Sequence, residues 1–125
     1  MYKIEKVGEN TFYIKALGTM PPSVAKKLVN DFNELTKDLE NISSIVDGLD
    51  LIILNLKSFE IILDFLKKLN PKLIKAAYVI GKSPILNKEA EILLERAKSP
   101  KRKIVKTLEE ARQWVGIEKI IIKKD

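Results

Sequence analysis

The side chains with which this chain could do chemistry are carboxylates, hydroxyls and amines, because its 125 residues include no cysteine and no histidine. These two absences exclude thiol nucleophiles, disulfides, zinc ribbons and hydrolases whose general base is an imidazole. Carboxylate or lysine catalysis and oxygen-ligated Mg²⁺ or Ca²⁺ remain open. Asp47 and Asp50 stand three residues apart in a predicted turn, which is too sparse a donor set for a metal site. We therefore expect a non-catalytic protein with no metal and no cofactor, and keep a carboxylate or lysine enzyme as a minor alternative.

A second group of candidates is Gly81-Lys82-Ser83, which is similar to the end of a phosphate-binding loop. That motif needs a glycine at the position where this chain has Ala76, so the backbone cannot wrap a phosphate. A loop that leads from a parallel strand into a helix N-terminus still attracts anions. We therefore predict that Lys82 and Ser83 bind an acidic group.

The chain is basic, with 23 lysines and arginines against 17 aspartates and glutamates and a formal net charge of +6. Only three of the cations are arginines, the residue best suited to phosphate and guanine recognition. The densest basic run, residues 98–103, contains no aromatic residue on which a base could stack. We interpret this run as an exposed basic turn, and keep a nucleic-acid-binding domain as an alternative function.

The elements that must position these residues alternate between strands and helices, which predicts a single α/β domain. Apolar residues recur every three or four positions in the helices and alternate or run continuously in the strands. Strands are expected at 2–7, 11–17, 74–80 and 103–106, and helices at 22–40, 56–69, 86–97 and, after a Thr107 cap, up to Val115. Asn55 is expected to cap the second helix, Thr107 and Glu110 to form a capping box, and Trp114 to pack with its N–H satisfied.

The middle of the chain contains two candidate strands, Ser43–Asp47 and Leu51–Leu56. Propensity favours the second, because a short run of apolar residues is typical of a buried strand. The local sequence does not decide between them.

No apolar run approaches the ~20 residues needed to span a bilayer, and the first residues lack the pattern of a signal peptide. We therefore expect a cytoplasmic protein without membrane insertion.

Two stretches carry a family likeness. Residues 76–84 read Ala-Ala-Tyr-Val-Ile-Gly-Lys-Ser-Pro, and residues 106–115 read Lys-Thr-Leu-Glu-Glu-Ala-Arg-Gln-Trp-Val. The first resembles the fourth strand and following loop, and the second the closing helix, of the STAS domain, the sulfate-transporter and anti-sigma-factor-antagonist module of the SpoIIAA-like superfamily. The resemblance covers residues 2–116. It implies one STAS-like (SpoIIAA-like) domain over residues 1–116, with a mixed, mostly parallel sheet, an N-terminal β-hairpin and about four helices.

The resemblance also implies an arrangement for the middle of the chain. In this family a strand ends in Asp, and a loop then carries Asp-Ser-Ser/Thr-Gly at the start of the second helix. Ser43–Asp47 fits that strand, so we expect residues 48–55 to form a loop. Asn55-Leu56-Lys57-Ser58 stands where Asp-Ser-Ser-Gly is expected, and the family's phosphorylated hydroxyl falls on Lys57. The resemblance thus implies a module whose phosphorylation switch is lost.

We expect this loop and the start of the second helix to dock a partner protein that the sequence does not identify. Apolar side chains would supply affinity and polar ones would form the rim. The predicted contact residues are Leu49, Leu51, Ile52, Ile53, Asn55, Lys57 and Ser58. The main alternative is a module that binds a small apolar or lipid-like ligand, over which the same apolar loop would close.

The remaining residues, 117–125, contain three consecutive isoleucines, Ile120-Ile121-Ile122. We expect this extension to be a strand or contact tail that pairs with a sheet edge or with a second copy of the chain in a homodimer.

Overall fold

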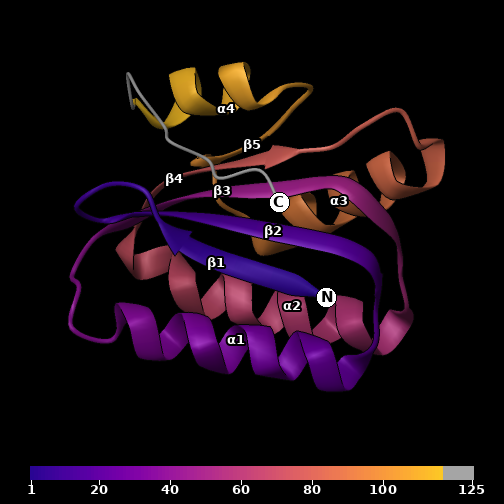
Figure 1. Ribbon diagram of the computed structural model, residues 1–125, viewed down its shortest axis with the longest axis horizontal. Coiled ribbons are helices and arrows are strands. Elements are labelled where there is room, and N and C mark those ends of the chain that lie inside the picture. The colour runs from indigo at the N-terminus through magenta and orange to yellow at the C-terminus, as the bar shows by residue number, and fades with distance from the viewer. Residues whose placement is uncertain (117–125) are drawn as a thin grey trace.

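The computed structural model describes residues 1–116 and contains a five-stranded sheet in the order β1-β2-β3-β4-β5 (Figure 1). β1 is antiparallel to β2, and the remaining neighbours are parallel. The strands are β1 (Tyr2–Lys6), β2 (Thr11–Met20), β3 (Ile42–Leu54), β4 (Leu73–Val79) and β5 (Arg102–Val105). The helices are α1 (Pro22–Thr36), α2 (Leu56–Leu69), α3 (Pro84–Ala97) and α4 (Leu108–Val115), and a 3₁₀ turn covers Asn70–Lys72. The predicted fold class, a mixed α/β sheet with an N-terminal hairpin and four helices, is confirmed.

The two faces of the sheet are covered unequally. α1, α2 and α3 pack on one face and α4 on the other, as Figure 1 shows for α1 and α4. Side chains alternate along β4, so that Ala76 and Tyr78 face α3 while Ala77 and Val79 face α4. Both faces of β4 are therefore buried, as expected for a strand inside a parallel sheet.

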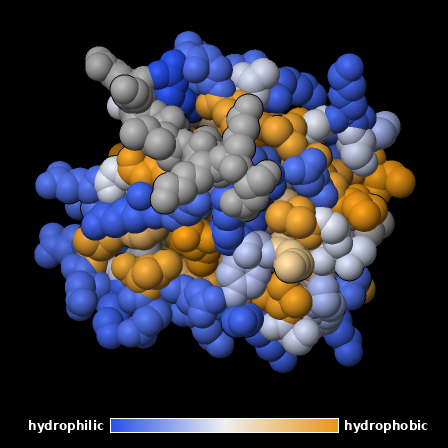
Figure 2. Space-filling model, in the orientation of Figure 1, coloured by the Kyte–Doolittle hydropathy of each residue, from blue (hydrophilic) through white to orange (hydrophobic). Residues whose placement is uncertain are grey.

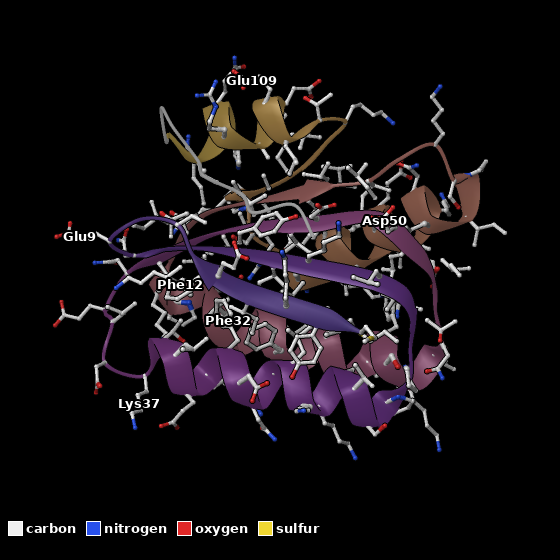
Figure 3. All side chains as sticks on the ribbon, in the orientation of Figure 1. Glu9, Phe12, Phe32, Lys37, Asp50 and Glu109 are labelled. Atoms are coloured by element: carbon white, nitrogen blue, oxygen red, sulfur yellow. The ribbon has the colours of Figure 1, made fainter. Side chains whose placement is uncertain are left out.

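The larger core is centred on three phenylalanines. Phe32 of α1 lies between Phe12 of β2 and Phe65 of α2, with ring centroids 5.5 Å apart in both pairs and edge-to-face geometry. Figure 3 shows Phe12 and Phe32 pointing toward each other between the sheet and α1. These contacts fix α1 and α2 side by side beneath the sheet.

The expected loop over residues 48–55 is wrong, because β3 continues through Asp47 to Leu54. Its continuation follows β2, which also runs further than expected and pairs Gly18 with Leu51 and Met20 with Leu54. Two register shifts along β2 accommodate this pairing. The ladder between β3 and β4 ends at Asp47 and Val79, so residues 48–54 pair with β2 alone.

Local signals at the helix ends are confirmed in part. Asn55 caps α2 by accepting a 2.9 Å hydrogen bond from the Ser58 N–H, and α2 has the predicted bounds. Thr107 caps α4, although the Glu110 carboxylate accepts from the Lys106 N–H and not from the cap residue itself. α1 ends at Thr36, earlier than predicted.

Trp114 departs from its expected environment. It packs against the core beneath α4, but its buried Nε1–H has no hydrogen-bond partner among the described residues. The ammonium groups of Lys75 and Lys103 lie 4.2 and 5.2 Å from its ring centroid. The prediction for residues 117–125 lies outside the described residues, and with it the division of the chain at residue 116.

Candidate functional site

Apolar side chains are exposed where the parallel strands end and two helices begin. We call this surface the apolar edge, and it has four members from β3, α2 and α3 that are large and exposed to solvent. They are Leu49 (44% exposed), Ile52 (63%), Leu56 (72%) and Ile85 (62%). Exposed side chains of this size are common singly, but a group of them at one edge is typical of an interaction site.

One close approach and one hydrogen bond bring these elements together. Leu49 of β3 lies so near Gly81, which precedes α3, that a Cβ added to this glycine would be 3.7 Å from Leu49 Cδ2. Further along α3, the Glu89 carboxylate accepts a 3.4 Å hydrogen bond from the Leu54 N–H. The carboxyl end of β3 therefore lies against the first turns of α3, and α2 begins directly after it. Figure 2 shows apolar residues gathered over this region, at the right of the view.

The predicted contact residues divide into exposed and inward-facing ones. Leu49 and Ile52 belong to the apolar edge, whereas Leu51 is half-buried and lines an internal cavity. Ile53 pairs with Thr19 through its backbone. Asn55 and Lys57 are exposed at the start of α2.

Ser58 does not lie at the rim, and that expectation is wrong. Its side chain is 0% exposed, and its hydroxyl donates a 2.5 Å hydrogen bond to the Met20 carbonyl oxygen. The hydroxyl thus joins α2 to the end of β2 and is closed to solvent.

Sequence reasoning missed Leu56 and Ile85. Both stand in the first turn of a helix, outside the apolar stripe that faces the core. Leu56 is the predicted start of the second helix and lies in the loop that carries the family's phosphorylation switch, and Ile85 lies just before the predicted start of the third helix. An apolar residue that falls off the stripe in a first turn is the signal that could have found them.

Lys82 and Ser83, the predicted anion site, lie exposed before α3. The Ser83 hydroxyl caps α3 by accepting a 3.2 Å hydrogen bond from the Leu86 N–H. The Asn87 amide closes the turn by donating to the carbonyl oxygens of Gly81 and Ser83. These interactions account for Ser83 as a helix cap, and anion binding here stays a prediction.

The basic run at 98–103 is not the uniformly exposed turn that was expected. Arg102 is buried, and its guanidinium donates to the Tyr78 hydroxyl, to Asn70 Oδ1 at 2.9 Å and to the Leu66 carbonyl at 2.9 Å. Lys101 donates a 2.9 Å hydrogen bond to the Leu73 carbonyl. These two cations hold β5 against β4 and the end of α2, which leaves fewer charges for a phosphate backbone.

The carboxylates are also held within the fold. Asp47 is buried and accepts hydrogen bonds from the Tyr13 hydroxyl and, at 3.1 Å, from the Leu49 N–H. Burial, followed by this hydrogen bond and the negative charge of Asp47, raises the pKa of Tyr13. Asp50 pairs with Lys15 at 3.2 Å. Within residues 1–116, no three histidine, cysteine or acidic side chains gather as metal ligands.

Burial also raises the pKa of Tyr78, and the charge and hydrogen bond of Arg102 oppose that shift. None of the described helices is long and apolar enough to cross a membrane.

No family model and no curated protein matches the sequence. Solved structures do match. An uncharacterized protein of the DUF3478 family from Shewanella loihica PV-4, described as having a SpoIIAA-like fold, superposes with a TM-score of 0.71 and 15% identity over 91% of both chains.

Two structures of SpoIIAA match as well. The unphosphorylated anti-sigma factor antagonist gives a TM-score of 0.67 at 13% identity, over 95% of this chain and 100% of the other. The phosphorylated Bacillus cell fate determinant gives 0.62 at 15% identity, over 92% and 99%. The chain therefore has the fold of a STAS, or SpoIIAA-like, domain, and the resemblance drawn from residues 76–84 and 106–115 is confirmed at the level of the fold.

Proposed function

We propose that this chain is a non-catalytic regulatory module of the STAS type, which docks a partner protein through the apolar edge formed by Leu49, Ile52, Leu56 and Ile85. The observation that carries the proposal is the exposure of these four side chains at one edge of the sheet. Burial of such a group against a partner would supply the apolar centre of an interface. SpoIIAA, which has the same fold, is described as an anti-sigma factor antagonist.

The charges beside the apolar edge indicate the chemistry of the partner. Lys57 follows Leu56 and Lys82 precedes Ile85 by three positions, and both lysines are exposed. The whole chain carries a net charge of +6. A partner surface with an apolar centre and acidic residues around it would match the apolar edge and its neighbouring lysines in charge. Electrostatic attraction would also steer such a partner toward this site.

We further propose that docking is not controlled by phosphorylation at the start of α2. Lys57 stands where the family resemblance places the phosphorylated hydroxyl. The neighbouring Ser58 hydroxyl is buried and hydrogen-bonded to Met20. A kinase would have to unfold the first turn of α2 to reach it, so detection of phosphorylated Ser58 in protein purified from its source would contradict this proposal.

The experiment is a quantitative pull-down from the source organism with the full chain and two matched variants. Ile52→Ser removes an apolar side chain from the apolar edge. Leu35→Ser removes one of similar exposure (55%) near the C-terminal end of α1, at the opposite end of the parallel strands. One protein retained by the parent and by Leu35→Ser, but reduced by about tenfold or more with Ile52→Ser, is expected.

Equal retention by both variants would contradict docking at the apolar edge. Circular dichroism of each variant confirms that loss of retention does not reflect unfolding. The retained protein should cross-link to Lys57 or Lys82, and its binding should weaken as salt is raised.

A further inference from the structure

An internal cavity of about 100 Å³ lies between the sheet and the helices on its larger core side. The sheet contributes residues such as Ala16 of β2 and Val46 of β3 to its walls, and the helices contribute residues such as Phe65 of α2 and Leu93 of α3. Small side chains line the cavity from both the sheet and the helices, namely Ala16 of β2 and Ala90 of α3.

The walls of this cavity are apolar throughout. Apart from Gly48 and Tyr78, every residue that lines it has an aliphatic, thioether or phenyl side chain. The Tyr78 hydroxyl accepts a hydrogen bond from the Arg102 guanidinium, and one hydroxyl is fewer than the polar partners that a buried water needs. A buried water needs two to four polar partners, and a cavity without them stays dry or takes an apolar guest.

One wall of the cavity lies outside the ladder between β3 and β4. Leu51 and Leu54 line the cavity from the part of β3 that pairs with β2 alone. The ladder with β4 ends at Asp47, so displacement of residues 49–54 breaks no hydrogen bond between β3 and β4. Its displacement would cost the pairing with β2 and the hydrogen bond from the Leu54 N–H to Glu89, and would leave the ladder between β3 and β4 intact.

We propose that this cavity is a binding site for a compact, uncharged apolar molecule, which enters past Leu51 and Leu54. A cavity of ~150 Å³ with the same kind of lining accepts benzene or xenon. The smaller volume here sets the ligand class as xenon, small hydrocarbons and molecules no larger than benzene. The site is separate from the apolar edge, since its lining side chains face inward.

The test is xenon binding to the full chain, followed through the methyl groups by ¹H–¹³C NMR as the xenon pressure is raised. Saturable shifts are expected for methyl groups that line the cavity, including those of Val46, Leu54 and Leu93. The methyl groups of Leu35 and Ile74, which are exposed elsewhere, should not show saturable shifts.

A matched pair of variants on α3 makes the test specific. Ala90→Leu places extra carbon atoms in the cavity, whereas Lys88→Leu adds the same side chain at an exposed position of the same helix. Ala90→Leu should weaken xenon binding at least tenfold, and Lys88→Leu should leave it unchanged. If Ala90→Leu does not fold, Ala16→Val fills the cavity from the sheet side.

Three results would overturn the proposal: shifts that grow linearly without saturation, shifts confined to the apolar edge, or equal saturable binding by the filled variant and the parent. The Ile52→Ser variant should retain xenon binding, so this site can be established or lost independently of partner docking.

Discussion

The hydroxyl of Ser58 donates a 2.5 Å hydrogen bond to the carbonyl oxygen of Met20, 38 positions earlier in the chain. The bond joins the first turn of α2 to the last residue of β2, and Ser58 is fully buried there. The same residue also donates its backbone N–H to the Asn55 side chain. Ser58 is therefore a structural link between the sheet and α2, next to the apolar edge but not part of its surface.

Substitution of Ser58 should destabilise the fold, and a charged replacement should do so more than an apolar one. Ser58→Ala leaves the Met20 carbonyl without its donor and should lower the free energy of unfolding by about 1–2 kcal/mol. Ser58→Asp places a carboxylate in a site without solvent and should cost more, or prevent folding. Lys57→Ala, at the exposed neighbouring position, should change stability by less than about 0.5 kcal/mol. Urea unfolding measures all three, and parental stability of Ser58→Asp would show that the site is open in solution.

Arg102 should contribute to stability and not to nucleic-acid binding. Arg102→Lys keeps the positive charge but cannot supply the donors that reach Tyr78, Asn70 and Leu66. We expect a loss of about 3 kcal/mol in the free energy of unfolding, against less than about 0.5 kcal/mol for the exposed Lys88→Ala. Urea unfolding tests this difference. A loss below about 1 kcal/mol for Arg102→Lys would mean that the guanidinium is not held as described.

The Tyr13–Asp47 pair should make stability depend on alkaline pH. The pKa of Tyr13 is raised in the folded protein, so below its ordinary value of 10.0 both folded and unfolded states keep the proton and the full contribution is present. Above that value the unfolded state ionises first, and stability falls as pH rises. Tyr13→Phe should be less stable than the parent by about 1–3 kcal/mol near neutral pH, because the buried Asp47 carboxylate loses a donor.

That difference should shrink above pH 10.0, since the variant has no Tyr13 proton to lose. Urea unfolding at about pH 8 and about pH 11 measures it. Burial, with the hydrogen bond and charge of Asp31, raises the pKa of Tyr2 to about 12, and the pKa of Tyr78 is raised as well. The parent and Tyr13→Phe should therefore both lose stability as pH rises above 10.0. A difference in stability between them that stays constant with pH would contradict the assignment to Tyr13.

Local sequence signals predicted most elements of the fold because they are set by neighbouring residues. The bounds of α2 follow from an apolar stripe that begins with Phe59 and from the Asn55 cap, and both are confirmed. The start of α4, capped by Thr107, also follows from neighbouring residues and is confirmed.

The continuation of β3 could not be predicted in this way. Gly48 and Asp50 indicate a turn by composition, and the family resemblance also implied a loop there. The outcome depends on β2, whose residues up to Met20 offer a pairing edge after two register shifts. Gly18, with φ of 69°, takes the left-handed conformation within this stretch of β2. The first candidate strand and residues 51–54 of the second thus belong to one strand, a result of long-range pairing.

The candidate site was predicted only in part for a similar reason. Leu49 and Ile52 are exposed as expected, but a sequence does not reveal that Ser58 meets Met20 or that Arg102 reaches the end of α2. These contacts join residues more than thirty positions apart. Burial of a polar side chain by distant partners has no local signature.

Gly48 and Gly81 form a matched pair with which to test the packing at the end of β4. A Cβ at Gly48 would lie 3.2 Å from Ile80 Cδ1 and 3.3 Å from the Val79 carbonyl oxygen, whereas at Gly81 its nearest neighbour would be Leu49 Cδ2 at 3.7 Å. Gly48→Ala should therefore cost about 1–2 kcal/mol, because a backbone oxygen cannot yield as a flexible side chain does. Gly81→Ala should be neutral or stabilising by up to about 1 kcal/mol, since alanine restricts the unfolded chain. Thermal and urea unfolding of both variants measure the contrast, and equal stabilities would mean that β3 beyond Asp47 does not lie as closely against β4 in solution.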